Sequence, residues 1–207
     1  APTGTAPVTD APPASSPTSP SLVWKDMSTP ESVLYDADGD RYLVSNINGG
    51  PLNTDNKGFI SELSPDGTVK KLKFIEGGTK KVTLNAPKGS AIVKGVFYVT
   101  DIDHVRMFDL KTGAAKGAIK FPDATFLNDI ATAPDGRIFV SDSGLRHDGE
   151  GFASTGTDAV YEIVKGKPVI ILKNKAGQAP NGLRYGRPTQ RWHQPDLGLQ
   201  QRNAAAH

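Results

Sequence analysis

The stretch LNDIATAPDGRIFVSD, residues 127–142, decides the fold of this 207-residue chain. Two runs of alternating apolar side chains flank an Asp-Gly step, which is the pattern of two antiparallel strands joined by a tight turn. Related stretches occur twice before it, as PESVLYDADGDRYLVSN at residues 30–46 and PKGSAIVKGVFYVTD at residues 87–101. Internal repeats of this length are typical of radial or stacked β architectures.

Two further strand patterns follow each repeat, separated by turns that contain Gly and Asp. The predicted strands are 32–36, 41–46, 58–63, 69–75, 89–93, 96–101, 104–110, 116–121, 129–133, 137–141, 158–164 and 168–172. Four short strands per unit of roughly 40–55 residues are typical of a β-propeller. We therefore expect an all-β, propeller-like fold: about three four-stranded blades plus the start of a fourth at Ala179–Leu183, a partial six-bladed propeller.

Two insertions interrupt the units between their second and third strands, at residues 47–57 and 143–157. Both are rich in Gly, Asn, Asp, Ser and Thr, so we expect surface loops. Matching loops in two blades should emerge on the same face, where they either contribute specificity or simply decorate the surface.

The two ends of the chain differ from the repeats. Residues 1–21 are rich in Pro, Ser, Thr and Ala, which predicts a disordered, extended tether. Residues 184–207 have no strand alternation and are an atypical tail that indicates a truncation, a change of frame or a vector-derived end. The blades occupy residues 22–183. Because three blades do not close a ring, the chain either completes the propeller as a homo-oligomer or remains an open arc.

Composition excludes several classes of function. The 24 basic and 22 acidic residues nearly balance, and the lysines are spread over turns and strand edges, so no nucleic-acid partner is expected. No segment approaches the roughly 20 apolar residues of a membrane span. The absence of cysteine excludes disulfides, thiolate catalysis and Cys-ligated metals.

The start of the chain bears on its compartment. It begins at Ala1 without Met and continues into the Pro/Ser/Thr-rich stretch, as expected for an exported protein, periplasmic or secreted, whose leader was removed. An artificial boundary that dropped the initiator Met is the alternative.

Three polar residues stand at matching points of the repeats: Glu31 in Pro30-Glu31-Ser32, Asn128 in Leu127-Asn128-Asp129, and Asn181 in Pro180-Asn181-Gly182. With these motifs the chain resembles, over about residues 22–183, the first half of the SMP-30/gluconolactonase/LRE-like family of six-bladed propellers. The family more often has Gly after the Glu. The second unit has Lys88 at this point and offers no oxygen ligand.

The resemblance implies a divalent cation, usually calcium, in the central channel, with Glu31, Asn128 and Asn181 as metal ligands. A fourth, acidic ligand of the family has no matching motif in this sequence. Inner strands of a propeller begin around the channel mouth, so these side chains are expected to converge. Carboxylate and amide oxygens suit calcium or magnesium. Each residue taken alone is better explained as a turn cap, and only the repeat brings a shared metal site level with that interpretation.

The function that this implies is a calcium-dependent hydrolase that opens lactone rings, such as sugar lactones or N-acyl homoserine lactones. Asp129 is the candidate catalytic residue, as a base or as an anchor for a ligand. The alternative is a non-enzymatic propeller that binds a small molecule or a protein, or an inactive fragment. His147, in the second insertion, is expected to be a surface histidine.

Overall fold

The computed structural model describes residues 23–79, 81–173 and 179–184. Within these ranges the chain forms fourteen strands and no helix, so no helix there could cross a membrane. The predicted tether at 1–21 and all of the predicted tail except residue 184 lie outside the described residues.

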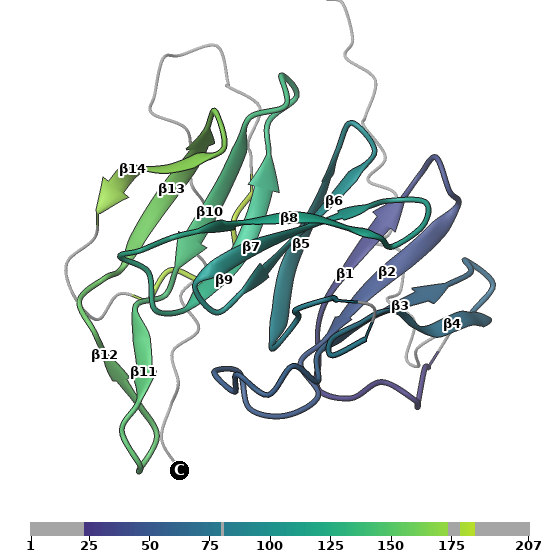
Figure 1. The fold of residues 1–207 in the computed structure, drawn as a ribbon, viewed down its shortest axis with the longest axis horizontal. Helices are drawn as coiled ribbons and strands as arrows, with labels where there is room; N and C mark the ends of the chain where they lie inside the picture. Colours follow the sequence, from purple (N-terminus) through teal and green to yellow (C-terminus); the bar gives the residue numbers. More distant parts are fainter. Residues whose placement is uncertain (1–22, 80, 174–178, 185–207) are drawn as a thin grey trace, which may run out of the picture.

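Twelve strands form three four-stranded antiparallel sheets that lie side by side as blades (Figure 1). The first blade contains β1 (Pro30–Asp36), β2 (Arg41–Asn46), β3 (Phe59–Leu63) and β4 (Val69–Glu76). The second contains β5 (Pro87–Val93), β6 (Val96–Asp101), β7 (His104–Asp109) and β8 (Ala115–Lys120). The third contains β9 (Leu127–Thr132), β10 (Ile138–Asp142), β13 (Ala159–Val164) and β14 (Lys167–Lys173). The prediction of an all-β, propeller-like fold is confirmed, and each of these strands lies within two residues of its predicted bounds.

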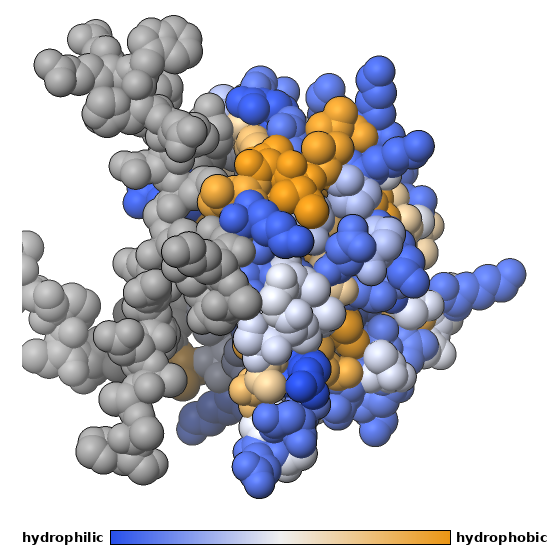
Figure 2. All heavy atoms as spheres, turned by 90° about the vertical axis from the view of Figure 1, so that its left-hand side faces the viewer, coloured by the Kyte–Doolittle hydropathy of each residue, from blue (hydrophilic) through white to orange (hydrophobic). Residues whose placement is uncertain are grey.

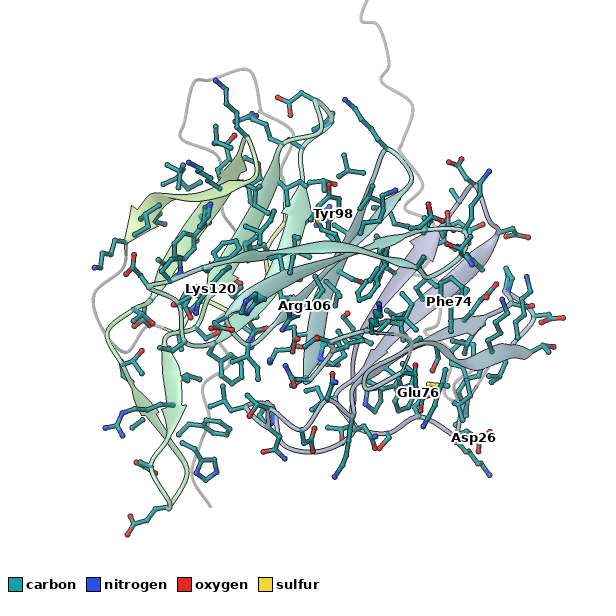
Figure 3. The ribbon with its side chains drawn as sticks, in the orientation of Figure 1. Asp26, Phe74, Glu76, Tyr98, Arg106 and Lys120 are labelled. Atoms are coloured by element: carbon teal, nitrogen blue, oxygen red, sulfur yellow. The ribbon has the colours of Figure 1, made fainter. Side chains whose placement is uncertain are left out.

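Apolar side chains fill the two spaces between neighbouring blades. The cluster between the first and second blades includes Leu43, Ile60 and Phe97, with Phe74 packed against it (Figure 3). A second cluster between the second and third blades is built in the same way, with Tyr98 packed against it (Figure 3). Alternation along each strand sends side chains to both faces of a blade, so a middle blade contributes to both clusters.

The innermost strands β1, β5 and β9 lie next to one another, which places their first residues around one edge of the arc. Antiparallel order puts the connection between the second and third strands at that same end. Both insertions accordingly project beyond it (Figure 1). The 143–157 insertion differs from the predicted loop, because it forms the hairpin β11 (Leu145–His147) and β12 (Phe152–Ser154).

The two ends of the arc expose apolar side chains. On β1, Val33 and Tyr35 are exposed on the face opposite Leu34, which packs toward the second blade. On β14, the run Val169–Leu172 is exposed, and apolar residues gather on this side of the molecule (Figure 2). Closure of the arc by a second copy of the chain stays a prediction.

Candidate functional site

A β-bulge interrupts the start of the innermost strand in every blade. Between Pro30 and Ser32, between Pro87 and Ser90, and at the start of β9, the inner strand has one residue more than its partner. A bulge bends the strand and redirects side chains. The residues that follow the first residue of these strands are Glu31, Lys88 and Asn128, and the corresponding residue of the fourth unit is Asn181. We call these four residues the ring positions.

Side-chain hydroxyls on second strands hold the ring positions of the following unit. Thr100 Oγ1 donates to the carbonyl oxygen of Asn128 at 2.8 Å. Ser141 Oγ donates to the carbonyl oxygen of Asn181 at 2.7 Å. We call such contacts hydroxyl joints. Both hydroxyl groups belong to buried residues, so the bonds are shielded from competing water.

The first blade makes the same joint through two hydroxyl groups. Ser32 Oγ donates to the carbonyl oxygen of Lys88 at 2.8 Å. Ser45 Oγ, on the second strand, lies 2.9 Å from Ser32 Oγ and accepts the Ser32 N–H at 3.0 Å. The carbonyl groups of Lys88, Asn128 and Asn181 are therefore all fixed by the blade before them.

Asp129 lies where the units meet. Its Oδ1 accepts the N–H of Ile130 at 2.8 Å, and its Oδ2 accepts the N–H of Leu183, in the fourth unit, at 2.7 Å. A Cβ on Gly89 of the second blade would lie 2.2 Å from Oδ1, so only glycine allows this approach. Burial raises the pKa of the Asp129 carboxyl, and the two backbone N–H groups partly oppose the rise.

Glu31 brings a second carboxylate to the same place. Desolvation by the surrounding strands, followed by the charge of Asp129, raises the pKa of Glu31 to about 7, while Lys88 opposes the rise. The residue is nevertheless exposed at the open end of the arc, so water there screens part of the effect. The two carboxylates therefore disfavour each other's charge, and a group that neutralises them would be stabilised here.

Lys88 is a buried cation at a ring position, with an exposed fraction of 1%. Its Nζ donates to the carbonyl oxygen of Ala86 at 3.0 Å and lies 4.6 Å from the centre of the Phe126 ring. Burial lowers the pKa of Lys88 to about 8, and the carboxylates of Asp101 and Glu31 oppose the decrease. The sequence assigns Lys88 no role beyond the lack of an oxygen ligand at this position. The alignment of this charged residue with Asn128 is the sequence feature that indicates a place in the site.

Asn128 presents an unpaired acceptor. The residue is 6% exposed, and its Nδ2 donates to Ser143 Oγ at 3.1 Å. Its Oδ1 is buried and has no hydrogen-bond partner among the described residues. A buried acceptor left unpaired costs about 1–3 kcal/mol, so this oxygen has the character of a ligand that awaits a donor or a cation.

Asn181 is placed by its backbone. Its carbonyl oxygen takes the hydroxyl joint from Ser141, and the carbonyl oxygen of the preceding Pro180 accepts Ser143 Oγ at 2.7 Å. The Asn181 residue itself is exposed. Ser143 thus bonds both the Asn128 amide and the residue that precedes Asn181.

Pairwise contacts therefore connect the strand starts that carry the predicted site residues: Asp129 bonds the N–H of Leu183, and Ser143 bonds Asn128 and Pro180. The described residues contain no group of three or more His, Cys, Asp or Glu side chains arranged to hold a metal. Any cation held there by described residues would depend on amide oxygens as well as carboxylates.

Two neighbouring acidic residues have structural roles. Asp101 and Asp142 close the second strands of their blades and are fully buried. Asp101 Oδ1 accepts the N–H of Ala86, and Asp142 Oδ1 accepts the N–H of Phe126, each at 2.9 Å. These bonds fix the segment that enters the innermost strand just before each ring position.

Comparison with known proteins gives a limited result. No family model matches the chain, and no curated protein matches it. Two similar solved structures are a candidate 6-phosphogluconolactonase of Bacteroides fragilis, at 16% identity, and a luciferin-regenerating enzyme, at 15% identity, each with a TM-score of 0.48. Each alignment covers 76% of this chain but only 44% and 50% of the respective structure. The second carries a name of the family that the motifs resemble, but likeness at this level is no argument for a family or an activity.

Proposed function

We propose that the chain acts as a hydrolase that opens lactone rings with the help of a divalent cation, for which calcium is the best candidate. The observation that carries the proposal is the buried, unpaired Oδ1 of Asn128 at a ring position. The neighbouring residue Asp129 adds a carboxylate whose charge also raises the pKa of Glu31. Hard oxygen donors of this kind are what calcium prefers, and six to eight are normally required, water included.

The residues present fit such a cation in part. Glu31 would supply a carboxylate oxygen, and Asn128 and Asn181 would supply amide oxygens. The Lys88 ammonium group lies close enough to Glu31 to lower its pKa, so it opposes a second positive charge. A carboxylate pair balanced by one buried lysine retains a net negative charge, which favours a cation.

Each residue would have a distinct task in lactone hydrolysis. When bound, the cation would polarise the lactone carbonyl or acidify a water molecule. Asp129 is held by Ile130 and Leu183 through one N–H on each oxygen. Because burial raises its pKa, Asp129 is a stronger base than an ordinary aspartate. It would accept a proton from the water that attacks the carbonyl carbon. It would then return that proton to the ring oxygen as the C–O bond breaks, so this oxygen leaves as the hydroxyl group of a hydroxy acid.

The test combines turnover with a binding readout. A panel of lactones is followed by pH indicator with calcium and with EDTA, and thermal unfolding is recorded under both conditions. We expect calcium-dependent ring opening and a rise in Tm of about 5 °C at saturating calcium. Asn128→Ala should remove the rise in Tm and lower turnover about 100-fold, because it deletes the unpaired oxygen.

Asn53→Ala is the matched control. It removes an exposed asparagine of the 47–57 insertion and leaves Asn128 and its contacts unchanged, so the rise in Tm with calcium should persist. Absence of turnover together with an unchanged Tm in the wild-type chain would rule out the cation site. Turnover that EDTA leaves intact would retain the hydrolase and remove calcium from it.

A binding propeller without catalysis is the second candidate. It is favoured by the lack of a three-membered His, Cys, Asp or Glu metal group in the described part of the chain. In that case the region around Asp129 would hold a small molecule or a protein segment. Export of the chain remains a separate prediction that neither function requires.

A further inference from the structure

The β11–β12 hairpin is fixed at its base. Gly144, at its start, donates its N–H to Asp142 Oδ1 at 3.0 Å and accepts the N–H of Thr155, at its end, at 2.7 Å. Gly144 has a φ of 59°, and a Cβ there would lie 2.6 Å from the backbone nitrogen of Asp158. The hairpin therefore leaves the third blade in one defined direction.

Three threonines attach the hairpin base to the segment that enters β9. Thr125 Oγ1 lies 2.9 Å from Thr155 Oγ1 and 3.1 Å from Thr157 Oγ1, and the last two are 2.9 Å apart. Thr125 immediately precedes Phe126, which lies two residues before the ring position Asn128. The hairpin and the entrance to the ring are consequently held as one unit.

Aromatic side chains continue from the ring to the hairpin. The Phe126 ring contacts Lys88 Nζ on one side and meets Phe152 of β12 edge-on, with a centroid distance of 6.1 Å. The His147 ring, on β11, is 5.5 Å from that of Phe152. Phe126 is buried, whereas Phe152 is 50% exposed. A series of ring contacts thus leads from the buried Phe126, two residues before Asn128, to the half-exposed phenyl ring of Phe152 at the surface.

The charged side chain of β11 lies on the other face of the hairpin. His147 pairs with Phe152, whereas Arg146 pairs with Ala153 and therefore lies on the opposite face of the two-stranded ribbon. Lys88 is buried beneath Phe126 and not available to a ligand from outside. Leu145 and Ser154 share the face of His147 and Phe152, so the strands β11 and β12 place no permanently charged group on that face, and the charged Asp148 and Glu150 lie in the turn that joins them.

We propose that the β11–β12 hairpin binds an apolar substituent of the substrate, so the site takes lactones that carry an alkyl-acyl or aryl group. This inference rests on the proposed function and selects between its substrate classes. A phosphorylated sugar lactone would need an exposed cation, and a polyhydroxylated one would need several hydrogen-bonding groups. A chain of methylene groups instead gains free energy by covering the exposed half of Phe152.

The inference is tested by binding, without turnover. N-Butanoyl- and N-decanoyl-homoserine lactam, whose rings resist hydrolysis, are titrated into the full chain by calorimetry. We expect the decanoyl lactam to bind at least about tenfold more tightly than the butanoyl lactam. Phe152→Ala should weaken decanoyl binding about tenfold and leave butanoyl binding unchanged. Phe152→Leu should retain most of the chain-length preference, because it keeps an apolar side chain.

Tyr35→Ala is the matched control, since Tyr35 is an aromatic residue of similar exposure, 48%, on the first blade. It should change neither affinity. Equal binding of the two lactams, no binding of either, or equal losses in Phe152→Ala and Tyr35→Ala would each overturn the inference. The hydrolase proposal is tested separately, by turnover of an unsubstituted lactone. Such a substrate has no group to contact the hairpin, so its turnover depends on the ring residues alone.

Discussion

The innermost strands of the second and third blades begin with the same backbone geometry but carry chemically opposite side chains at the ring position. Both have a bulge, both have a carbonyl group held by the preceding blade, and both have an aspartate that fixes the incoming segment. At the ring position, however, the second blade buries the cation of Lys88 and the third buries the unpaired oxygen of Asn128. Repetition thus defines where a side chain points, and a single residue defines what it does there.

The largest effect is expected at the contact between these two blades. Gly89→Ala would add a Cβ 2.2 Å from Asp129 Oδ1 and 2.6 Å from Asp129 Cα, so the bulges must separate. We expect a loss of about 4 kcal/mol in the free energy of unfolding, or roughly 10 °C in Tm. Denaturant unfolding measures the first value and calorimetry the second.

Gly151→Ala serves as the control for the glycine substitution. A Cβ at this position in the hairpin tip meets nothing within 4 Å, so stability should change by less than about 0.5 kcal/mol. A Gly89→Ala variant as stable as Gly151→Ala would show that the two blades do not approach as closely as described.

The charge of Lys88 gives the next largest effect. Its folded-state pKa, about 8, lies below the 10.5 of the unfolded chain, so the unfolded state binds more protons between these values. The free energy of unfolding should therefore increase with pH, by on the order of 2–3 kcal/mol from pH 8 to pH 10. Urea unfolding across this window measures it.

Lys88→Met keeps the length of the side chain and removes its charge. The increase between pH 8 and pH 10 should disappear, and at pH 7 the variant should be at least as stable as the wild-type chain. The measurement stops at pH 10 because burial raises the pKa of Tyr161 to about 12, and its titration then acts in the opposite direction. An increase that persists in Lys88→Met would assign it to another group.

A smaller effect comes from the hydroxyl joint between these blades. Thr100→Val preserves shape but leaves the carbonyl group of Asn128 without its donor. We expect a loss of about 1.5 kcal/mol in the free energy of unfolding. Thr68→Val, at an exposed turn in the first blade where the hydroxyl makes no joint, should change it by less than about 0.5 kcal/mol. Equal losses in the two variants would contradict a specific role for the joint.

The fold was predictable because its signals are local. Alternation, Asp-Gly turns and a repeated strand pair located every blade strand to within two residues. The β11–β12 hairpin was not predictable, since three-residue strands such as Leu145–His147 are too short to establish a period.

The site was predictable only in part. Glu31, Asn128 and Asn181 could be aligned because the repeat places them at equivalent points. The role of Lys88 could not, because burial and a covering phenyl ring from Phe126 depend on how two blades pack. The capture of the Leu183 N–H by Asp129 likewise joins residues 54 positions apart, which no local pattern reports.

The hydroxyl joints have a direction in time. In each one the donor belongs to the earlier blade and the acceptor to the later unit, as with Thr100 and the carbonyl group of Asn128. During synthesis a finished blade therefore already contains the donor hydroxyl group for the next segment when that segment leaves the ribosome. The joints therefore allow each new blade to be added to a finished one from the N-terminal side.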